Sequence, residues 1–133
     1  MLKRLQTIGV ALILMVAWCE TSTADYMQNY SAWRRLNLVQ QQAYGMGLVD
    51  GLTTVDEGDE SEAYALGLVT CILELKLTSG MVAEAISTHY AQNTESWSLP
   101  PSTIFARAIV KGPCLNHINA ARKSRGLKPW EKG

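Results

Sequence analysis

The chain lacks any imbalance of charge, because 12 lysines and arginines are matched by 12 aspartates and glutamates among its 133 residues. A surface that binds nucleic acid needs a concentrated excess of lysine and arginine to neutralise phosphates, so this absence argues against nucleic acid as a partner. Charged residues make up only 18% of the chain and hydrophobic residues 47%, which excludes a chain that is disordered throughout. The length fits one folded domain.

The sequence also lacks the motifs of the common enzyme classes. It has no phosphate-binding glycine loop, no metalloprotease helix motif and no Gly-x-Ser-x-Gly nucleophile turn. We interpret His89 and His117 as histidines of the surface or its boundary rather than as general bases. Glu74 is interpreted as an ordinary surface partner of Lys76 or Arg107. We therefore expect no catalytic residues, no metal and no cofactor.

No hydrophobic run in the sequence is long enough to span a membrane. The longest, from Ile8 to Trp18, is shorter than the roughly 20 apolar residues that a membrane helix needs. It follows the basic residues Lys3 and Arg4 and precedes the small residues Ser22-Thr23-Ala24, which is the pattern of a cleaved export signal. We expect residues 1–24 to be removed and the mature chain to be periplasmic.

Two alternatives to this signal stay open. Cys19 follows the apolar run and would carry lipid in a lipoprotein, although bulky Trp18 stands where lipoprotein signals have a small residue. An uncleaved membrane anchor is the other alternative. We favour cleavage after Ala24, which starts the mature chain at Asp25.

Cysteine is scarce, with three in the whole chain. If Cys19 leaves with the signal, Cys71 and Cys114 form an even pair in an oxidising compartment, and we expect them to make one disulfide. Closing so long a loop would stabilise the fold by about 4 kcal/mol. A metal site made of Cys71, His89, Cys114 and His117 is the less favoured alternative, because zinc ligands usually come in short-spaced pairs.

Apolar residues recur at helical spacings of three and four from Tyr30 onward, and no segment alternates convincingly as a strand does. We therefore predict an all-α fold, a compact bundle of four to five helices with one disulfide. The helices are expected from Tyr30 to near Val55, from about Asp59 to Leu75, from Thr78 to Tyr90, from Pro100 to Lys111, and from Leu115 to about Ser124.

The pattern also predicts how these helices pack. The helix from about Asp59 to Leu75 is apolar on more than one face, so we expect it to be the central, buried one. Ala43, Gly47 and Gly51 share one helix face, which predicts a close approach of a neighbouring helix there. We expect residues 25–114 to form the domain and residues 115–133 to be a basic C-terminal extension.

One element carries a resemblance to a known family. The segment Tyr44-Gly45-Met46-Gly47-Leu48-Val49-Asp50-Gly51 is similar to an aromatic-Cys-x-Gly-hydrophobic-hydrophobic-x-Gly element of the Rap/Tai-type immunity proteins of bacterial type VI secretion. Further similarity lies at Cys71, at Leu77-Thr78 with Val82 and Tyr90, and in the segment from Pro101 to Cys114. The resemblance implies a helical periplasmic protein that neutralises a peptidoglycan amidase effector.

The chain departs from that family at three places. Gly45 stands where the family has a cysteine, so a disulfide of many members is missing here. The segment between Cys71 and Thr78 is longer than the usual proline-containing turn, and the chain extends further after Cys114.

The predicted partner is thus a secreted effector protein, and the sequence leaves a homodimer open. We expect contact through an acidic loop and one aromatic anchor, Trp97, because tryptophan is common in binding hot spots. The loop residues are Asp56, Glu57, Asp59, Glu60 and Glu62. In the alternative interpretation the acids only solvate a turn and Trp97 covers the core.

Two other functions compete with inhibition of an effector. One is a small periplasmic chaperone-like stress protein, which exposes apolar surface when its carboxylates are protonated. The other is an enzyme whose active site has no recognisable motif.

Overall fold

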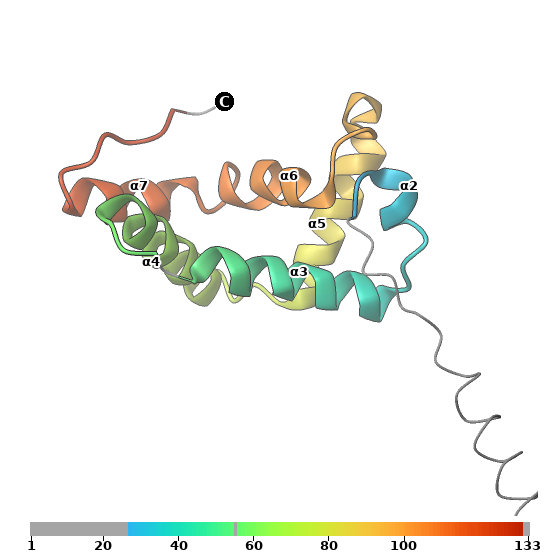
Figure 1. The fold of residues 1–133 in the computed structure, drawn as a ribbon, viewed down its shortest axis with the longest axis horizontal. Helices are drawn as coiled ribbons and strands as arrows, with labels where there is room; N and C mark the ends of the chain where they lie inside the picture. Colours follow the sequence, from blue (N-terminus) through green and yellow to red (C-terminus); the bar gives the residue numbers. More distant parts are fainter. Residues whose placement is uncertain (1–26, 55, 132–133) are drawn as a thin grey trace, which may run out of the picture.

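Two rows of helices, joined by a steep crossing helix, make up the fold (Figure 1). The computed structural model describes residues 27–54 and 56–131. One row holds α3 (Leu38–Thr53) and α4 (Asp59–Glu74). The other holds α6 (Pro101–Phe105), a π-helical turn η2 (Ala106–Val110) and α7 (Leu115–Ser124). Helix α5 (Ser79–Gln92) connects the rows, and α2 (Tyr30–Trp33) and a 3₁₀ turn, η1 (Thr94–Ser96), close the end beside it.

The predicted all-α class with one disulfide is confirmed. Cys71 in α4 and Cys114 just before α7 are bonded across a Cα–Cα distance of 5.3 Å, and both are fully buried. Around them lies one apolar core, whose largest fully buried side chains include Trp33, Leu68, Ile86, Tyr90, Ile104, Phe105 and Ile118. The indole Nε1 of Trp33 donates to Ser87 Oγ at 3.0 Å, so this buried donor is satisfied.

Side-chain caps mark the starts of α2, α3 and α5. Thr78 Oγ1 accepts a hydrogen bond from the backbone N–H of Met81, which confirms the predicted start of α5. Asn37 and Gln40 form a reciprocal capping box at the start of α3. The predicted single helix from Tyr30 to near Val55 is therefore wrong, because extended backbone at Asn37 separates α2 from α3.

The close helix contact predicted at Ala43, Gly47 and Gly51 is also wrong. All three residues are exposed, and a Cβ atom added at Gly47 or Gly51 would meet nothing within 4 Å. The crowded glycines are Gly45 and Gly67. A Cβ on Gly45 would lie 2.9 Å from Val82 Cγ1, and a Cβ on Gly67 would lie 2.8 Å from the backbone nitrogen of Ile118.

Helix α4 is not the fully buried central helix that its composition predicted. One face packs on α7 and the core through Ala63, Gly67, Leu68 and Cys71, whereas another face carries exposed leucines. Helix α5 takes the central place, because it contacts α3, α6, η1 and η2.

The predicted boundary between a domain ending at residue 114 and an extension of residues 115–133 does not match the packing. Leu115, Ile118 and Ala121 of α7 are buried, and α7 makes its largest contact with α4. The segment after α7 folds back and is held at Trp130, whose backbone N–H and C=O both bond to the Asn119 side chain. Residues up to 131 therefore belong to the domain.

Within the described residues, no single helix is long and apolar enough to cross a membrane, and only α4 and α5 taken together, across their 105° bend, reach that length and apolarity. The predicted export signal, residues 1–24 with Cys19, lies outside the described residues.

Candidate functional site

Trp97 lies at the end of the molecule that α2 and η1 form, and it is 47% exposed. The turn η1 is anchored by Ser96, whose buried hydroxyl lies 3.3 Å from Arg107 Nη1 and 3.4 Å from His89 Nε2. The indole Nε1 of Trp97 donates to the carbonyl of Tyr90 at 2.9 Å. This exposed ring is therefore held by the fold in one orientation.

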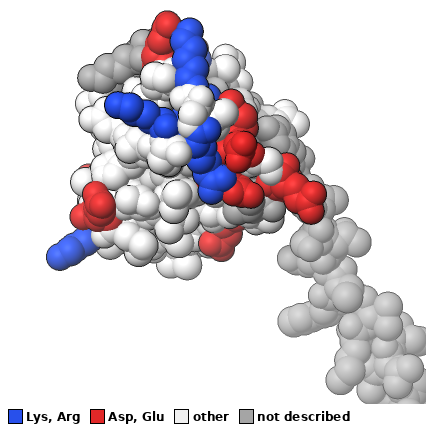
Figure 2. All heavy atoms as spheres, turned by 90° about the vertical axis from the view of Figure 1, so that its left-hand side faces the viewer, with Lys and Arg blue, Asp and Glu red and all other residues white. Residues whose placement is uncertain are grey.

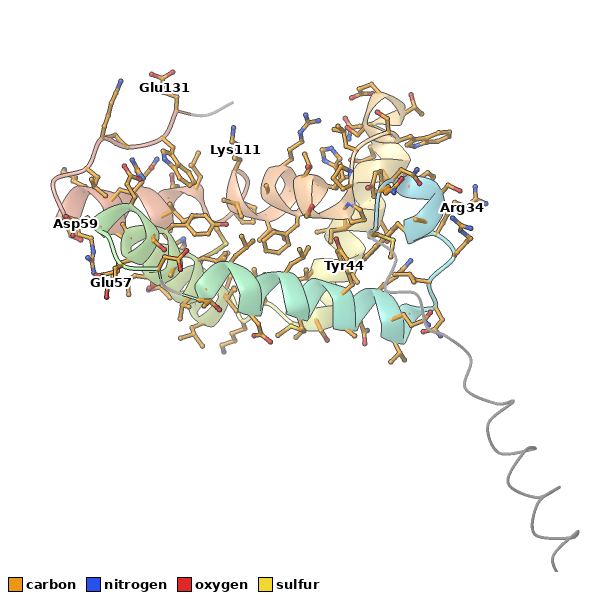
Figure 3. The ribbon with its side chains drawn as sticks, in the orientation of Figure 1. Arg34, Tyr44, Glu57, Asp59, Lys111 and Glu131 are labelled. Carbon is orange, nitrogen blue, oxygen red and sulfur yellow. A yellow bond between two sulfur atoms is a disulfide. The ribbon has the colours of Figure 1, made fainter. Side chains whose placement is uncertain are left out.

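Two residues of α2 and its end complete this surface, which we call the aromatic corner (Tyr30, Arg34 and Trp97). The ring of Tyr30 lies 5.1 Å from that of Trp97, and the backbone N–H of Tyr30 donates to the Trp97 carbonyl at 3.1 Å. The Arg34 guanidinium lies 5.7 Å from the centre of the Tyr30 ring. Figure 3 shows Arg34 at the outer edge of this end of the molecule.

A shallow hollow of about 390 Å³ opens at the aromatic corner. Besides the three corner residues, Asn29, Ser31 and Ser98 line it. Beneath the corner, Tyr90 is buried and its hydroxyl donates to the Leu99 carbonyl at 2.6 Å. Burial raises the pKa of the Tyr90 phenol, so this hydrogen bond persists over the physiological range. The hollow thus combines apolar rings, one cation and small polar groups on a fixed base.

The predicted acidic loop is largely tied to α7. Glu60 makes a two-pronged ion pair with Arg122, and Arg125 pairs with both Asp59 and Glu62. The hydrogen bond from Arg122 lowers the pKa of the Glu60 carboxyl. Figure 2, which faces this end of the molecule, shows acidic and basic side chains side by side.

Arg122 is the most enclosed member of this cluster, with 5% of its surface exposed. Its Nε donates to the carbonyl of Lys128 at 2.8 Å, and its guanidinium lies 5.0 Å from the centre of the Trp130 ring. Three of the five predicted loop acids therefore hold the fold together. Asp56 and Glu57 are exposed and form no ion pair within the described part of the chain.

The structure does not bring the two predicted contact features together. Asp59 and Glu57 lie at one end of the molecule and Arg34, beside Trp97, lies at the other (Figure 3). The assignment of the acidic residues and Trp97 to partner binding stays a prediction.

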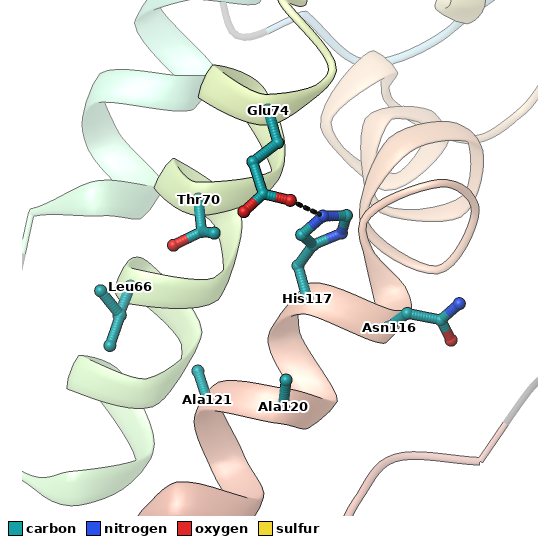
Figure 4. A pocket seen from close by; sticks show the side chains of 7 residues that line it. All are labelled: Leu66, Thr70, Glu74, Asn116, His117, Ala120 and Ala121. Atoms are coloured by element: carbon teal, nitrogen blue, oxygen red, sulfur yellow. Dashed lines mark hydrogen bonds and ion pairs between the residues drawn. The ribbon is translucent and has the colours of Figure 1, made fainter.

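A second hollow, of about 500 Å³, lies between α4 and α7 (Figure 4). On its wall, Glu74 Oε2 and His117 Nε2 are 2.9 Å apart, so the partner of Glu74 is His117 and not Lys76 or Arg107 as the sequence suggested. The Nδ1 atom of His117 is buried without a hydrogen-bond partner among the described residues. Thr70 also lines the hollow.

Glu74 and His117 can hold a proton between them, and the groups around His117 decide which chemistry the pair could support. A nucleophilic site needs a hydroxyl or thiol within hydrogen-bond reach of the base, and the one side-chain hydrogen bond of His117 within the described residues is with Glu74 Oε2. The nearby sulfur atoms of Cys71 and Cys114 are bonded to one another. Glu74 and His117 join α4 to α7 one helical turn beyond the disulfide.

The alternative metal set is not assembled within the described residues, where no three histidine, cysteine or acidic side chains are placed to share an ion. Both cysteine sulfurs are occupied, and His89 contacts Ser96 instead.

The proximity of Tyr30 and Arg34 to Trp97 was not predicted from the sequence. Nothing in their spacing predicts this contact, because residues 30 and 97 meet only through the tertiary fold. The pairing of α4 acids with α7 arginines had a visible signal in the sequence, since two segments of opposite charge flank the Cys71–Cys114 pair.

The fold is thus a small all-α, disulfide-bonded domain with an exposed aromatic corner. No known protein-family model, no curated protein and no solved structure matches the chain.

Proposed function

We propose that the chain is an exported binding protein that inhibits a peptidoglycan amidase effector of type VI secretion by occupying its surface. The observation that carries this proposal is Trp97, a large aromatic ring that is 47% exposed and yet fixed by a hydrogen bond to the Tyr90 carbonyl. Tryptophan, tyrosine and arginine dominate binding hot spots, and the aromatic corner offers one of each.

The rigidity of the aromatic corner supports a binding role. An interface loses affinity when flexible side chains must be ordered on association. Here the indole and the Tyr30 ring are already held by each other and by backbone hydrogen bonds. Little conformational entropy is lost when a partner covers them.

Two further features support the proposed cellular setting. The pattern of residues 1–24 is that of an export signal, and a buried disulfide is typical of proteins in an oxidising compartment. The choice of an amidase effector as partner rests on the resemblance of the segment Tyr44–Gly51 and of the segment around Cys71 to the Rap/Tai-type immunity proteins.

The acidic residues take a narrower role in this proposal. Asp59, Glu60 and Glu62 are engaged with α7, so the charges available to a partner are those of Asp56 and Glu57. Exposed charges of this kind act mainly on the rate of association.

The proposal expects a gene for a secreted amidase beside the gene of this chain, and the test is the affinity of the oxidised protein for that amidase. Trp97→Ala and Arg34→Ala should each weaken binding, with about a 30-fold or greater loss for Trp97→Ala, as expected for a hot spot of about 2 kcal/mol. Val39→Ala, an exposed apolar position on α3, is the matched control and should bind as the wild type does. Equal affinity for all variants would place the contact elsewhere.

A second candidate, an acid-activated chaperone-like protein, is favoured by one observation. Carboxylates of α4 hold α7 in place, and their protonation at low pH would release the ion pairs with Arg122 and Arg125. This function would show as suppression of client aggregation that appears only on acidification. Suppression at neutral pH alone, or at no pH, would rule it out.

A further inference from the structure

The aromatic corner carries a cation that has no anionic partner within the described residues. The Arg34 guanidinium lies 5.7 Å from the centre of the Tyr30 ring, and Arg34 forms no ion pair in the described part of the chain. A cation at this distance is attracted by the face of an aromatic ring. The contact orders the side chain without using the N–H groups at the edge of the guanidinium. Those donors therefore stay available at an exposed surface.

The hollow beside Arg34 offers further hydrogen-bond donors and no carboxylate. Asn29 Oδ1 already accepts from the backbone N–H of Ala32 at 3.0 Å, so the amide NH₂ is what the Asn29 side chain has left to offer. Two hydroxyls, those of Ser31 and Ser98, also line the hollow. Glu95 of the adjacent turn η1 does not line it. A surface of donors around one cation is suited to an acceptor that carries a negative charge.

The segment that contains α2 has charges of one sign. Between Asp25 and Asp50 the sequence has Arg34 and Arg35 and no acidic residue. Asp59, which is paired within the molecule, lies at the other end from Arg34 (Figure 3). The charge of the corner is therefore not neutralised by this segment, and it would attract an anion that approaches.

The two rings supply the apolar part of the surface. The indole Nε1 of Trp97 donates to the Tyr90 carbonyl, so the exposed part of this ring is apolar. The Tyr30 ring lies 5.1 Å from it and beside Arg34. A partner that covers both rings would exclude water from the guanidinium, and an ion pair is stronger where water is excluded. The planar guanidinium can bind both oxygens of one carboxylate.

From these observations we infer that the aromatic corner binds its protein partner through a side-chain carboxylate. An aspartate or glutamate of the partner pairs with Arg34, and an apolar side chain next to it covers the rings of Trp97 and Tyr30. The inference rests on the proposed function for the identity of the partner, but the preference for a carboxylate can be measured without the amidase.

The experiment compares two short peptides that differ in one charge. The first is phenylalanine–aspartate–phenylalanine, blocked at both ends so that the aspartate carries the only charge, and the second has asparagine at its centre. Binding to the oxidised protein is followed by NMR at the indole N–H signal of Trp97. We expect the aspartate peptide to bind at least about fivefold more tightly, as for a hydrogen-bonded charged group.

Two single-charge variants locate the preference. Arg34→Gln should bind both peptides with the affinity that the wild type has for the asparagine peptide. Arg35→Gln is the matched control, since it removes the neighbouring cation, whose Nε donates to the Ser31 carbonyl at 3.3 Å. It should keep the preference. Circular dichroism and an unchanged Trp97 indole signal without peptide confirm that both variants are folded.

Four outcomes would overturn the inference. They are equal binding of the two peptides by the wild type, a preference that survives in Arg34→Gln, a preference that Arg35→Gln abolishes, and a Trp97 signal that neither peptide shifts. A signal shifted only by an uncharged N-acetylglucosamine oligomer is an instance of the fourth, and it would make the corner a saccharide site.

The result is separable from that of the inhibition assay. A protein that prefers the aspartate peptide but does not inhibit the amidase would contradict the proposed function alone. A protein that inhibits the amidase but shows no such preference would contradict this inference alone.

Discussion

Gly67 and Gly47 both lie inside helices, but their surroundings are opposite. Gly67 faces the backbone of Ile118, where α4 and α7 approach closely, while Gly47 faces solvent on α3. A glycine in a helix costs about 1 kcal/mol relative to alanine. That cost is offset by a close helix contact at Gly67 and by nothing in the described fold at Gly47.

This contrast predicts opposite effects of one substitution. Gly67→Ala should destabilise the protein by about 3 kcal/mol, because its Cβ atom would overlap the Ile118 backbone. Gly47→Ala should stabilise it by about 1 kcal/mol through helix propensity alone. Urea unfolding with the disulfide intact measures both. A loss of stability in Gly47→Ala would mean that this face is covered after all.

Arg122 supplies the second prediction at this scale. Its hydrogen bond lowers the pKa of Glu60 in the folded protein below the value in the unfolded chain. The ion pair therefore stabilises the fold above the unfolded pKa, and this contribution is lost as the pH falls through the folded pKa. We expect Arg122→Met to lower the melting temperature at neutral pH, and this difference from the wild type should shrink as the solution is acidified.

The control for this comparison is Lys123→Met, since Lys123 is exposed and forms no ion pair within the described residues. Its melting temperature should follow that of the wild type at every pH. If the deficit of Arg122→Met stays constant down to strong acid, the stabilisation comes from packing against Trp130 and not from charge.

At the scale of helices, three sets of contacts hold α4 and α7 together along their length. The ion pairs of Arg122 and Arg125 lie at one end, the Gly67 contact in the middle, and the Cys71–Cys114 disulfide with the Glu74–His117 pair at the other. The disulfide joins residues 43 apart in the sequence, so it restricts a long loop of the unfolded chain.

We expect the double variant Cys71→Ala with Cys114→Ala to lose about 4 kcal/mol of stability. Its helical content should be largely retained, because the packing of α4 on α7 has other contacts. Denaturant unfolding of the variant, beside the wild type with and without reductant, measures this. A stability equal to that of the oxidised wild type would show that the bond adds nothing beyond the packing.

The helices show how far local sequence determines this fold. The starts of α5 and α7 were predictable, because Thr78 caps the first and Pro113 shortly precedes the second. The break between α2 and α3 also has a local cause, the Asn37 and Gln40 capping box, but it lay inside a continuous helical pattern. Which glycine is crowded was not predictable, since this depends on the helix that packs opposite.

In the candidate site, too, some features could be predicted from the local sequence and others depend on the tertiary fold. Trp97 stood out in the sequence as an aromatic residue in a polar connection, and it is exposed. Its neighbours Tyr30 and Arg34 come from a distant segment and are placed by the tertiary fold. The acidic segment was identified by composition, whereas its engagement with Arg122 and Arg125 depends on how α7 packs.

For the whole molecule, two surfaces are separate in space. The aromatic corner lies at one end and the ion-pair cluster of α4 and α7 at the other. A partner that covers the aromatic corner would therefore leave the ion pairs between α4 and α7 in place.

The most direct test of the proposed function is cleavage of purified peptidoglycan by a secreted amidase, which the proposal expects to be encoded beside this gene, titrated with the oxidised protein. We expect cleavage to stop at one inhibitor chain per amidase. At the same ratio, Trp97→Ala should restore cleavage, while Val39→Ala should inhibit fully. Undiminished cleavage in the presence of excess wild-type protein would contradict the account.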